Sequence, residues 1–272
     1  MDQIEVEGLR VAYERAGTGP AVALGHGFVG DGRSTWARQI ETLSANFTVV
    51  AWDAPGAGSS SDPPAGFRVA DYADCWASFL RALGLTRVHL VGLSFGGIVA
   101  LSVVERHPAL PASLTLVGGY AGWRGSLPGE EVDARLRTCL RLSELPPEDF
   151  ARAMLPSMFS ATAPEAVVAS FLPSVRSFSP AGFRAMALAS AEADLRDGLA
   201  QVGVPTLLVH GDHDVRAPMK TAEEIRAVIP SSRLVVLPGV GHVATVEAPD
   251  AVSRELGDFL ASVDDGRWDT GR

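Results

Sequence analysis

The stretch Val91-Gly92-Leu93-Ser94-Phe95-Gly96-Gly97 decides the fold, because it joins an apolar strand to a helix through one sharp turn. The run Val88–Leu93 predicts a buried strand, and the segment Phe95–His107 predicts a helix. Glycines on either side leave room for the chain to fold back on itself. Such a turn strains its central residue and presents the Ser94 hydroxyl at the carboxyl edge of the sheet. The first helical amides are unpaired there, so the Phe95 N–H can donate to a developing oxyanion.

On both sides of this turn, short apolar runs alternate with longer amphipathic segments, which is typical of a parallel sheet covered by helices. The first two runs meet at Gly8 and predict an antiparallel hairpin. We therefore expect an α/β fold with a mostly parallel, eight-stranded sheet and helices on both faces. The expected strands are Ile4–Glu7, Leu9–Arg15, Ala21–Gly25, Phe47–Asp53, Val88–Leu93, Ser113–Gly118, Thr206–His210 and Arg233–Leu237. The expected helices are Trp36–Leu43, Val69–Leu83, Phe95–His107, Pro218–Val228 and Pro249–Val263.

The alternation stops once, between about Ala121 and Ala200, where prolines separate short helix-like segments and no strand pattern occurs. This segment predicts a helical insertion on top of the sheet. We accordingly expect a core formed by residues 1–120 and 201–263, a helical cap at 121–200 and a flexible polar tail at 264–272.

Charge and composition exclude several classes of protein. The 272 residues carry 23 Lys and Arg against 32 Asp and Glu, a formal net charge of −9, which provides no basic field for nucleic acid or anionic membrane. Two cysteines, Cys75 and Cys139, are too few for a disulfide framework, which favours a reduced, cytoplasmic protein. Neither a signal peptide nor a transmembrane run is recognisable. The expected partner is a small-molecule substrate, and a homodimer stays open.

A serine hydroxyl needs a base to become nucleophilic, and six histidines compete for that role. His89 lies within a strand and His107 at a helix end, where structural roles are expected. His242 follows the last strand in the loop Pro238-Gly239-Val240-Gly241-His242, so it emerges at the carboxyl edge of the sheet. His242 is therefore the candidate base.

The carboxylate that orients this base is expected in the turn after the preceding strand, His210-Gly211-Asp212-His213-Asp214-Val215-Arg216-Ala217-Pro218. Asp212 and Asp214 are both candidates at this point. Two imidazoles and two carboxylates could instead bind a metal, but neighbours in a short turn rarely converge on one ion without ligands from elsewhere. We therefore expect no metal.

The order Ser94, acid, His242 resembles that of the α/β-hydrolase superfamily, and the resemblance covers about residues 4–262. Three further motifs support it. Gly25-His26-Gly27-Phe28 is similar to the oxyanion loop of that superfamily, Asp53-Ala54-Pro55-Gly56-Ala57-Gly58-Ser59-Ser60 to its D-x-x-G-x-G-x-S turn, and Gly211…Asp214…Pro218 to its acid turn. The resemblance implies Asp214 as the acid and the Phe28 N–H as the second oxyanion donor. It also implies that Asp53 is structural.

The resemblance implies a serine hydrolase that cleaves a small ester or lactone through Ser94, His242 and Asp214 and an acyl-enzyme intermediate. Serine at position 94 argues against the aspartate-dependent dehalogenase and epoxide-hydrolase branches. Hydrolases of carbon–carbon bonds in ring-fission products and cofactor-free perhydrolases stay open, although the loop at Gly25–Phe28 looks more like that of esterases, enol-lactonases and perhydrolases. A small-ligand receptor on the same fold is the alternative from another class. No dinucleotide or P-loop motif occurs, so we expect no cofactor.

The substrate pocket is expected beneath the insertion, which contains 5 of the 11 phenylalanines and 3 of the 5 methionines of the chain. Any one of these side chains could equally pack the insertion against the sheet. Arg33 and Arg124 could bind a substrate carboxylate, although solvated surface arginine is the simpler interpretation. The candidate pocket residues are His26, Trp123, Met154, Met158, Phe159, Val215 and Val243.

Overall fold

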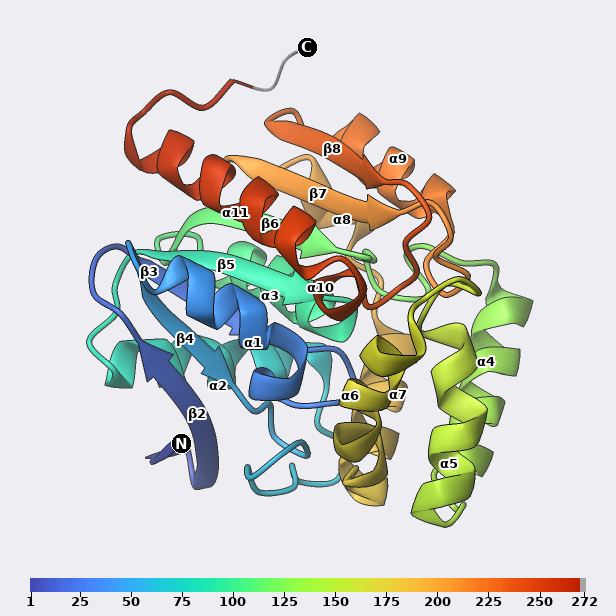
Figure 1. The fold of residues 1–272 in the computed structure, drawn as a ribbon. Helices are drawn as coiled ribbons and strands as arrows, with labels where there is room; N and C mark the ends of the chain where they lie inside the picture. Colours follow the sequence, from blue (N-terminus) through green and yellow to red (C-terminus); the bar gives the residue numbers. More distant parts are fainter. Residues whose placement is uncertain (270–272) are drawn as a thin grey trace.

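The computed structural model describes residues 1–269, and one eight-stranded sheet forms its centre (Figure 1). In spatial order the strands are β1 (Asp2–Val6), β2 (Leu9–Ala16), β4 (Thr48–Trp52), β3 (Ala21–Gly25), β5 (Val88–Leu93), β6 (Pro111–Val117), β7 (Thr206–Gly211) and β8 (Ser232–Leu237). The pairs β1–β2 and β2–β4 are antiparallel, and all other neighbouring strands are parallel. The predicted eight-stranded, mostly parallel sheet is confirmed.

Helices cover both faces of the sheet, as predicted. In Figure 1, α1 (Gly32–Leu43) and α11 (Pro249–Asp264) lie in front of the strands, and α2 (Val69–Ala82) and α3 (Phe95–Arg106) lie behind them. Helix α9 (Met219–Val228) packs on β7 and β8. Every residue of β5 is buried, as are ten of the twelve residues of α3. The turn between these two elements is therefore buried in the core as well.

Helices alone fill the segment between β6 and β7. They are α4 (Gly129–Leu142), α5 (Pro147–Met154), a 3₁₀ turn (Leu155–Ser157), α6 (Glu165–Arg176), α7 (Pro180–Glu192) and α8 (Arg196–Leu199). Prolines stand at or next to the first residue of α4, α5, α6 and α7, where a missing N–H costs nothing. Figure 1 shows α4 to α7 beyond the arrowheads of the parallel strands. We call residues 121–200 the insertion; its separation from the core as a domain stays a prediction.

Several predicted boundaries were wrong, for local reasons. Glu7 lies in the hairpin turn rather than in β1, because Glu7 and Gly8 both have positive φ. Helix α1 begins four residues earlier than expected, because the Asp31 side chain accepts a hydrogen bond from the Ser34 N–H and caps the helix. The short helices α8 and α10 (Ala244–Glu247) were not anticipated.

The expected flexible tail falls partly outside the described residues, since residues 270–272 are not among them. Asp264 is the last residue of α11. The Trp268 ring packs edge-on against Phe259, with 4.6 Å between centroids, and the Arg233 guanidinium lies 5.3 Å from the Trp268 ring centroid. Among the described residues, no helix is both long enough and apolar enough to cross a bilayer.

Candidate active site

Ser94 occupies the turn between β5 and α3 in a strained conformation, with φ of 52° and ψ of −110°. Among the described non-glycine residues, only Glu7 shares a positive φ, and it lies in the exposed hairpin turn. The Ser94 N–H donates to Val117 O at 2.9 Å, which ties the turn to the end of β6. Strain of this kind persists only where the surroundings enforce it, and it is typical of functional sites.

Two glycines make this turn possible. A Cβ added at Gly92 would lie 2.3 Å from the backbone carbon of Gly96, and one added at Gly96 would lie 2.2 Å from Gly25 O. No side chain fits at either distance, so both positions require glycine. The close approach brings the loop after β3 against the start of α3.

That loop carries the Phe28 amide to the serine. A Cβ at Gly27 would lie 3.8 Å from the Ser94 Cβ, so the loop runs directly beside the serine. Among the described residues, neither the Phe28 N–H nor the Phe95 N–H donates a hydrogen bond. Two unpaired amides next to a serine can stabilise negative charge on a substrate oxygen.

His26 braces this loop. Its Nε2 accepts a hydrogen bond from the Ala54 N–H at 2.9 Å, which leaves Nδ1 protonated and donating to Gly27 O. Both ring nitrogens are thus engaged with the backbone, and the ring is buried. His26 therefore offers no free polar atom to a substrate and holds the loop of residues 25–28 in place, while its position as a pocket residue stays a prediction.

His242 and Asp214 form a buried pair at the ends of β8 and β7. The His242 Nδ1 lies 2.7 Å from Asp214 Oδ2. Asp214 Oδ1 accepts from the Arg216 and Ala217 N–H groups at 2.8 and 2.9 Å. Because a carboxylate only accepts, Nδ1 must carry the proton, and Nε2 of a neutral His242 is left as the basic nitrogen.

Burial and charge set the pKa values of this pair. Burial raises the pKa of Asp214, but the charge of His242 and the hydrogen bonds from His242 and Ala217 outweigh it, so the net pKa is lowered. Burial lowers the pKa of His242 below its ordinary value, and Asp214 offsets only part of that effect. The pair is therefore a carboxylate and a neutral imidazole at pH 7, as a general base requires.

Gly118 brings the serine and the pair together. It follows Val117, which accepts the Ser94 N–H, and a Cβ at Gly118 would lie 3.1 Å from His242 Nδ1 and 3.2 Å from Asp214 Oδ2. Ser94 and the pair thus flank the same end of β6. Among the described residues no hydrogen bond joins Ser94 Oγ to His242; in ligand-free sites such bonds are often long.

The insertion contacts the loop that carries His242. The Val243 N–H donates to Met158 O at 2.9 Å. The Glu247 carboxylate accepts from the Gly241 N–H at 3.0 Å and from the Ser160 N–H at 3.1 Å. The insertion is therefore bonded directly to the backbone after His242 and, through the Glu247 carboxylate, indirectly to the backbone before it.

The remaining pocket candidates divide into buried and exposed residues. Trp123 is buried and meets the Phe28 ring edge-on, with 6.0 Å between centroids. Val215 is 71% exposed, and its place in the pocket stays a prediction. The other buried candidates are Met154, Met158, Phe159 and Val243.

Arg33 and Arg124 both lie at the surface. The Arg33 side chain is 65% exposed and pairs with Glu14 at 2.6 Å, and Arg124 is 56% exposed and lies 4.0 Å from Asp133. Their exposure and acidic partners agree with the simpler interpretation as solvated surface arginines. Arg216 was not among the predicted site residues; its backbone O accepts from Tyr120 Oη and from Arg135 Nη2. Nothing in the sequence separates it from the many surface arginines.

The other acidic and imidazole candidates have structural partners. Asp53 is buried and accepts from the Gly32 N–H at 2.9 Å and from the Ser59 N–H at 2.8 Å, as a turn residue does. Asp212 accepts from the Gly239 N–H at 2.6 Å, so Asp214 alone contacts His242. His210 Nε2 donates to Ala217 O at 2.7 Å.

Across the described chain, no three His, Cys, Asp or Glu side chains form a group suited to a metal ion.

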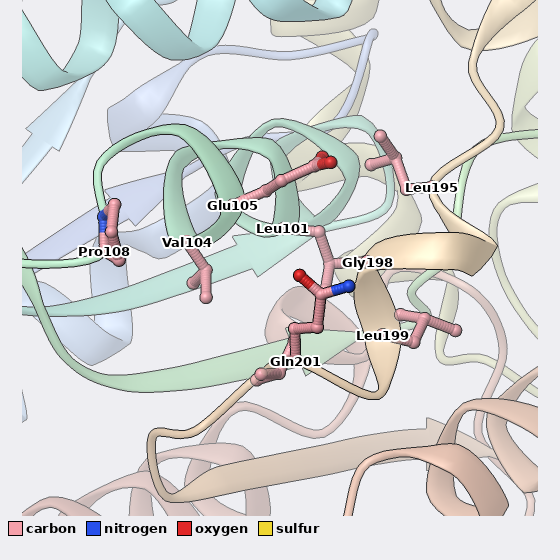
Figure 2. A pocket seen from close by; sticks show the side chains of 9 residues that line it. Leu101, Val104, Glu105, Pro108, Leu195, Gly198, Leu199 and Gln201 are labelled. Atoms are coloured by element: carbon pink, nitrogen blue, oxygen red, sulfur yellow. The ribbon is translucent and has the colours of Figure 1, made fainter.

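A cavity of about 190 Å³ lies elsewhere, between the C-terminal half of α3 and the connection around α8 (Figure 2). Leu101, Val104 and Pro108 line one side of it, and Leu195 and Leu199 the other. Ser94 precedes the first residue of α3, so at about 1.5 Å per residue Leu101 is already some 10 Å along the helix. The cavity is therefore separate from the serine and its partners.

Comparison with known proteins agrees with this geometry. A family model described as alpha/beta hydrolase fold matches residues 20–249. A putative carbamate hydrolase, RutD of Pantoea ananatis, is 30% identical over 251 residues, covering 88% of this chain and 87% of the relative. The chain belongs to the α/β-hydrolase fold family.

Solved structures of named enzymes have the same fold. An esterase from Thermogutta terrifontis, solved with malate bound, superposes with a TM-score of 0.89 at 30% identity, covering 97% of this chain and 99% of the esterase. The enol-lactonase of Burkholderia xenovorans LB400 superposes with a TM-score of 0.88 at 25% identity, covering 96% and 100% of the two chains. Together with the family match, these relatives identify the chain as a hydrolase enzyme.

Proposed function

We propose that this hydrolase cleaves a small carboxylic ester or lactone through Ser94, His242 and Asp214 by way of an acyl-enzyme. The buried hydrogen bond of 2.7 Å between His242 Nδ1 and Asp214 Oδ2 carries the proposal. It fixes the imidazole tautomer whose free nitrogen can remove a proton from the serine hydroxyl.

In the first half-reaction, His242 Nε2 takes the proton of Ser94 Oγ as that oxygen attacks the substrate carbonyl carbon. Asp214 stabilises the imidazolium that forms. The Phe28 and Phe95 amides donate to the tetrahedral oxyanion, where the loss of one such donor typically costs about 10²–10³-fold in rate. His242 then gives its proton to the leaving alcohol, and the acyl group stays on Ser94.

In the second half-reaction, His242 removes a proton from a water molecule that attacks the acyl-enzyme carbonyl. The same two amides stabilise the second oxyanion, and His242 returns the proton to Ser94 Oγ as the acid leaves. No step requires a cofactor. For a lactone the leaving alcohol stays attached to the acyl group, so one ring-opened hydroxy acid is released.

Two features favour an ester or lactone over the other reactions. Phe28 follows directly after Gly25-His26-Gly27, so a single short loop supplies the second oxyanion amide. Relatives named as an esterase and an enol-lactonase superpose on nearly the whole chain. The relative named as a carbamate hydrolase adds carbamates to the substrates worth testing.

The proposal is tested by a hydrolysis screen over short-chain esters, lactones, carbamates and dienone acids, with Ser94→Ala as the blank. We expect ester or lactone turnover that falls by about 10³-fold or more in Ser94→Ala. The matched control is Ser170→Ala, at an exposed serine of α6, which should keep full activity. Turnover that survives Ser94→Ala would overturn the mechanism.

A fluorophosphonate probe separates an enzyme from a receptor with the same fold. The probe phosphonylates an activated serine with loss of fluoride. We expect labelling of the native protein and of Ser170→Ala, and none of Ser94→Ala. Absence of labelling in folded native protein would favour the receptor alternative.

A further inference from the structure

Three arginines in the described chain are half-buried, and one of them lacks an acidic partner. Arg135 pairs with Glu131 at 2.9 Å, and Arg233 lies 3.8 Å from Glu255. No carboxylate of the described residues lies within 4.0 Å of the Arg216 guanidinium. Burying a cation costs hydration free energy unless a nearby negative charge offsets the loss. The structure therefore contains a partly desolvated guanidinium that forms no ion pair with a described carboxylate, although the charge of Asp214 acts on it from a greater distance.

The Arg216 side chain is held in one place. Its Nη1 donates to Ser157 Oγ at 2.8 Å, and its Cζ lies 5.1 Å from the centroid of the Phe28 ring. Tyr120 and Arg135 bind its backbone carbonyl. A guanidinium has five donors, so one bond to a serine leaves most of the fork unused. Fixed and unfilled donors of this kind suit a planar anion.

Arg216 also lies beside the reacting groups. Its own N–H donates to Asp214 Oδ1, two residues before it in the same turn. Its charge acts on His242, whose pKa it helps to lower. The ring under its guanidinium belongs to Phe28, whose backbone N–H is the proposed oxyanion donor. The cation is thus between the insertion, which supplies Ser157, and the catalytic edge of the sheet.

We infer that Arg216 binds a free carboxylate on the substrate, so that the natural substrate is an ester or lactone bearing a second, ionised carboxyl group in its acyl part. The inference rests on the proposed function, because the carbonyl that is cleaved must reach Ser94. The substrate carboxylate would supply Arg216 with the ion-pair partner that it lacks among the described residues. The same contact would link the core to the insertion. Arg135, already paired with Glu131, would not compete for it.

The experiment compares matched substrates that differ only in charge. Methyl half-esters of C4 to C6 dicarboxylic acids are each assayed against the methyl ester of the corresponding ω-carboxamide, with acid release followed by pH-stat. We expect the native enzyme to prefer the half-ester, mostly through a lower KM. The length of the dicarboxylic acid whose half-ester is preferred most strongly indicates the distance between Ser94 and the Arg216 guanidinium.

Arg216→Met keeps the side-chain volume and removes the charge. We expect it to reduce the preference for the half-ester by about 10- to 100-fold, the range for a charged hydrogen bond. Arg216→Lys should restore part of the preference, because it returns the charge without the planar fork. The matched control Arg33→Met, at an exposed arginine, should leave both substrates unaffected.

Two outcomes would overturn the inference. One is a native enzyme that hydrolyses the amide esters in a Ser94-dependent way without preferring any half-ester; the proposed function would then stand alone. The other is an Arg216→Met variant that keeps the full preference of the native enzyme for the half-ester, which would show that the substrate carboxylate is bound elsewhere. Failure of the proposed function is recognised separately, by absence of both fluorophosphonate labelling and Ser94-dependent turnover.

Discussion

Ser94 adopts a backbone conformation that is costly for any residue with a side chain, and the surrounding glycines maintain it. The proposed reactivity depends on a few such single-residue features. Asp214 fixes the proton of His242 on Nδ1, and Gly118 leaves the space in which the two side chains meet. Each feature predicts a measurable effect.

The pH dependence follows from the lowered pKa of His242. A base is active in its neutral form, so kcat/KM should be constant at neutral pH and fall as the pH drops through the pKa of His242. Burial places that pKa below the ordinary histidine value of about 6.5, and the positive charge of Arg216 acts in the same direction. The measurement is kcat/KM for a neutral ester from pH 4 to 9. An acid limb with its midpoint above 6.5 would contradict the assignment.

Gly118→Ala tests the space beside the pair. The new Cβ would lie 3.1 Å from His242 Nδ1, on a residue whose φ is +52°. We expect a loss of about 1–3 kcal/mol in the free energy of unfolding and a fall of at least about 10-fold in kcat/KM. Urea denaturation and steady-state kinetics measure the two effects. Gly129→Ala is the matched control, because nothing lies within 4 Å of a Cβ there; equal effects at both positions would refute the argument.

At the scale of elements, all eight strands and the five core helices could be predicted, because β-branched runs and amphipathic segments are signals local to the chain. The hairpin turn at Glu7 and the cap at Asp31 shifted boundaries by a few residues. The path of the insertion could not be predicted, since its helices are placed by tertiary packing. Arg216 was missed for the same reason: burial and the absence of an acidic partner are properties of the fold.

Glu247 links two elements that the sequence does not relate. Its carboxylate holds the Gly241 amide beside His242 and the Ser160 amide of the insertion. Glu247→Ala should cost about 1–3 kcal/mol of stability, because two partly buried N–H groups lose a charged acceptor. For a neutral ester it should also lower kcat, with a smaller change in KM, because the loop that carries His242 is held less firmly. Glu223→Ala, at an exposed position of α9, is the control. If both variants match the native protein in urea melts and kinetics, the link has no role.

At the scale of the whole molecule, the proposed reacting groups follow three strands that lie within four consecutive strands of the sheet. Ser94 follows β5, Asp214 follows β7 and His242 follows β8, and the strand order places β5, β6, β7 and β8 side by side. The insertion between β6 and β7 lies beyond that edge (Figure 1). The net charge of −9 disfavours polyanions at long range, while Arg216 places one positive charge close to His242.

The central claim is that Ser94 carries the acyl group during turnover. Mixing the native enzyme with a 4-nitrophenyl ester, quenching in acid within the first turnover and digesting the protein for mass spectrometry tests it most directly. We expect an acyl adduct on the peptide that contains Ser94, together with a burst of nitrophenol equal to the enzyme concentration if deacylation is slow. Steady ester turnover with no adduct on that peptide, or with the adduct on another residue, would contradict the account.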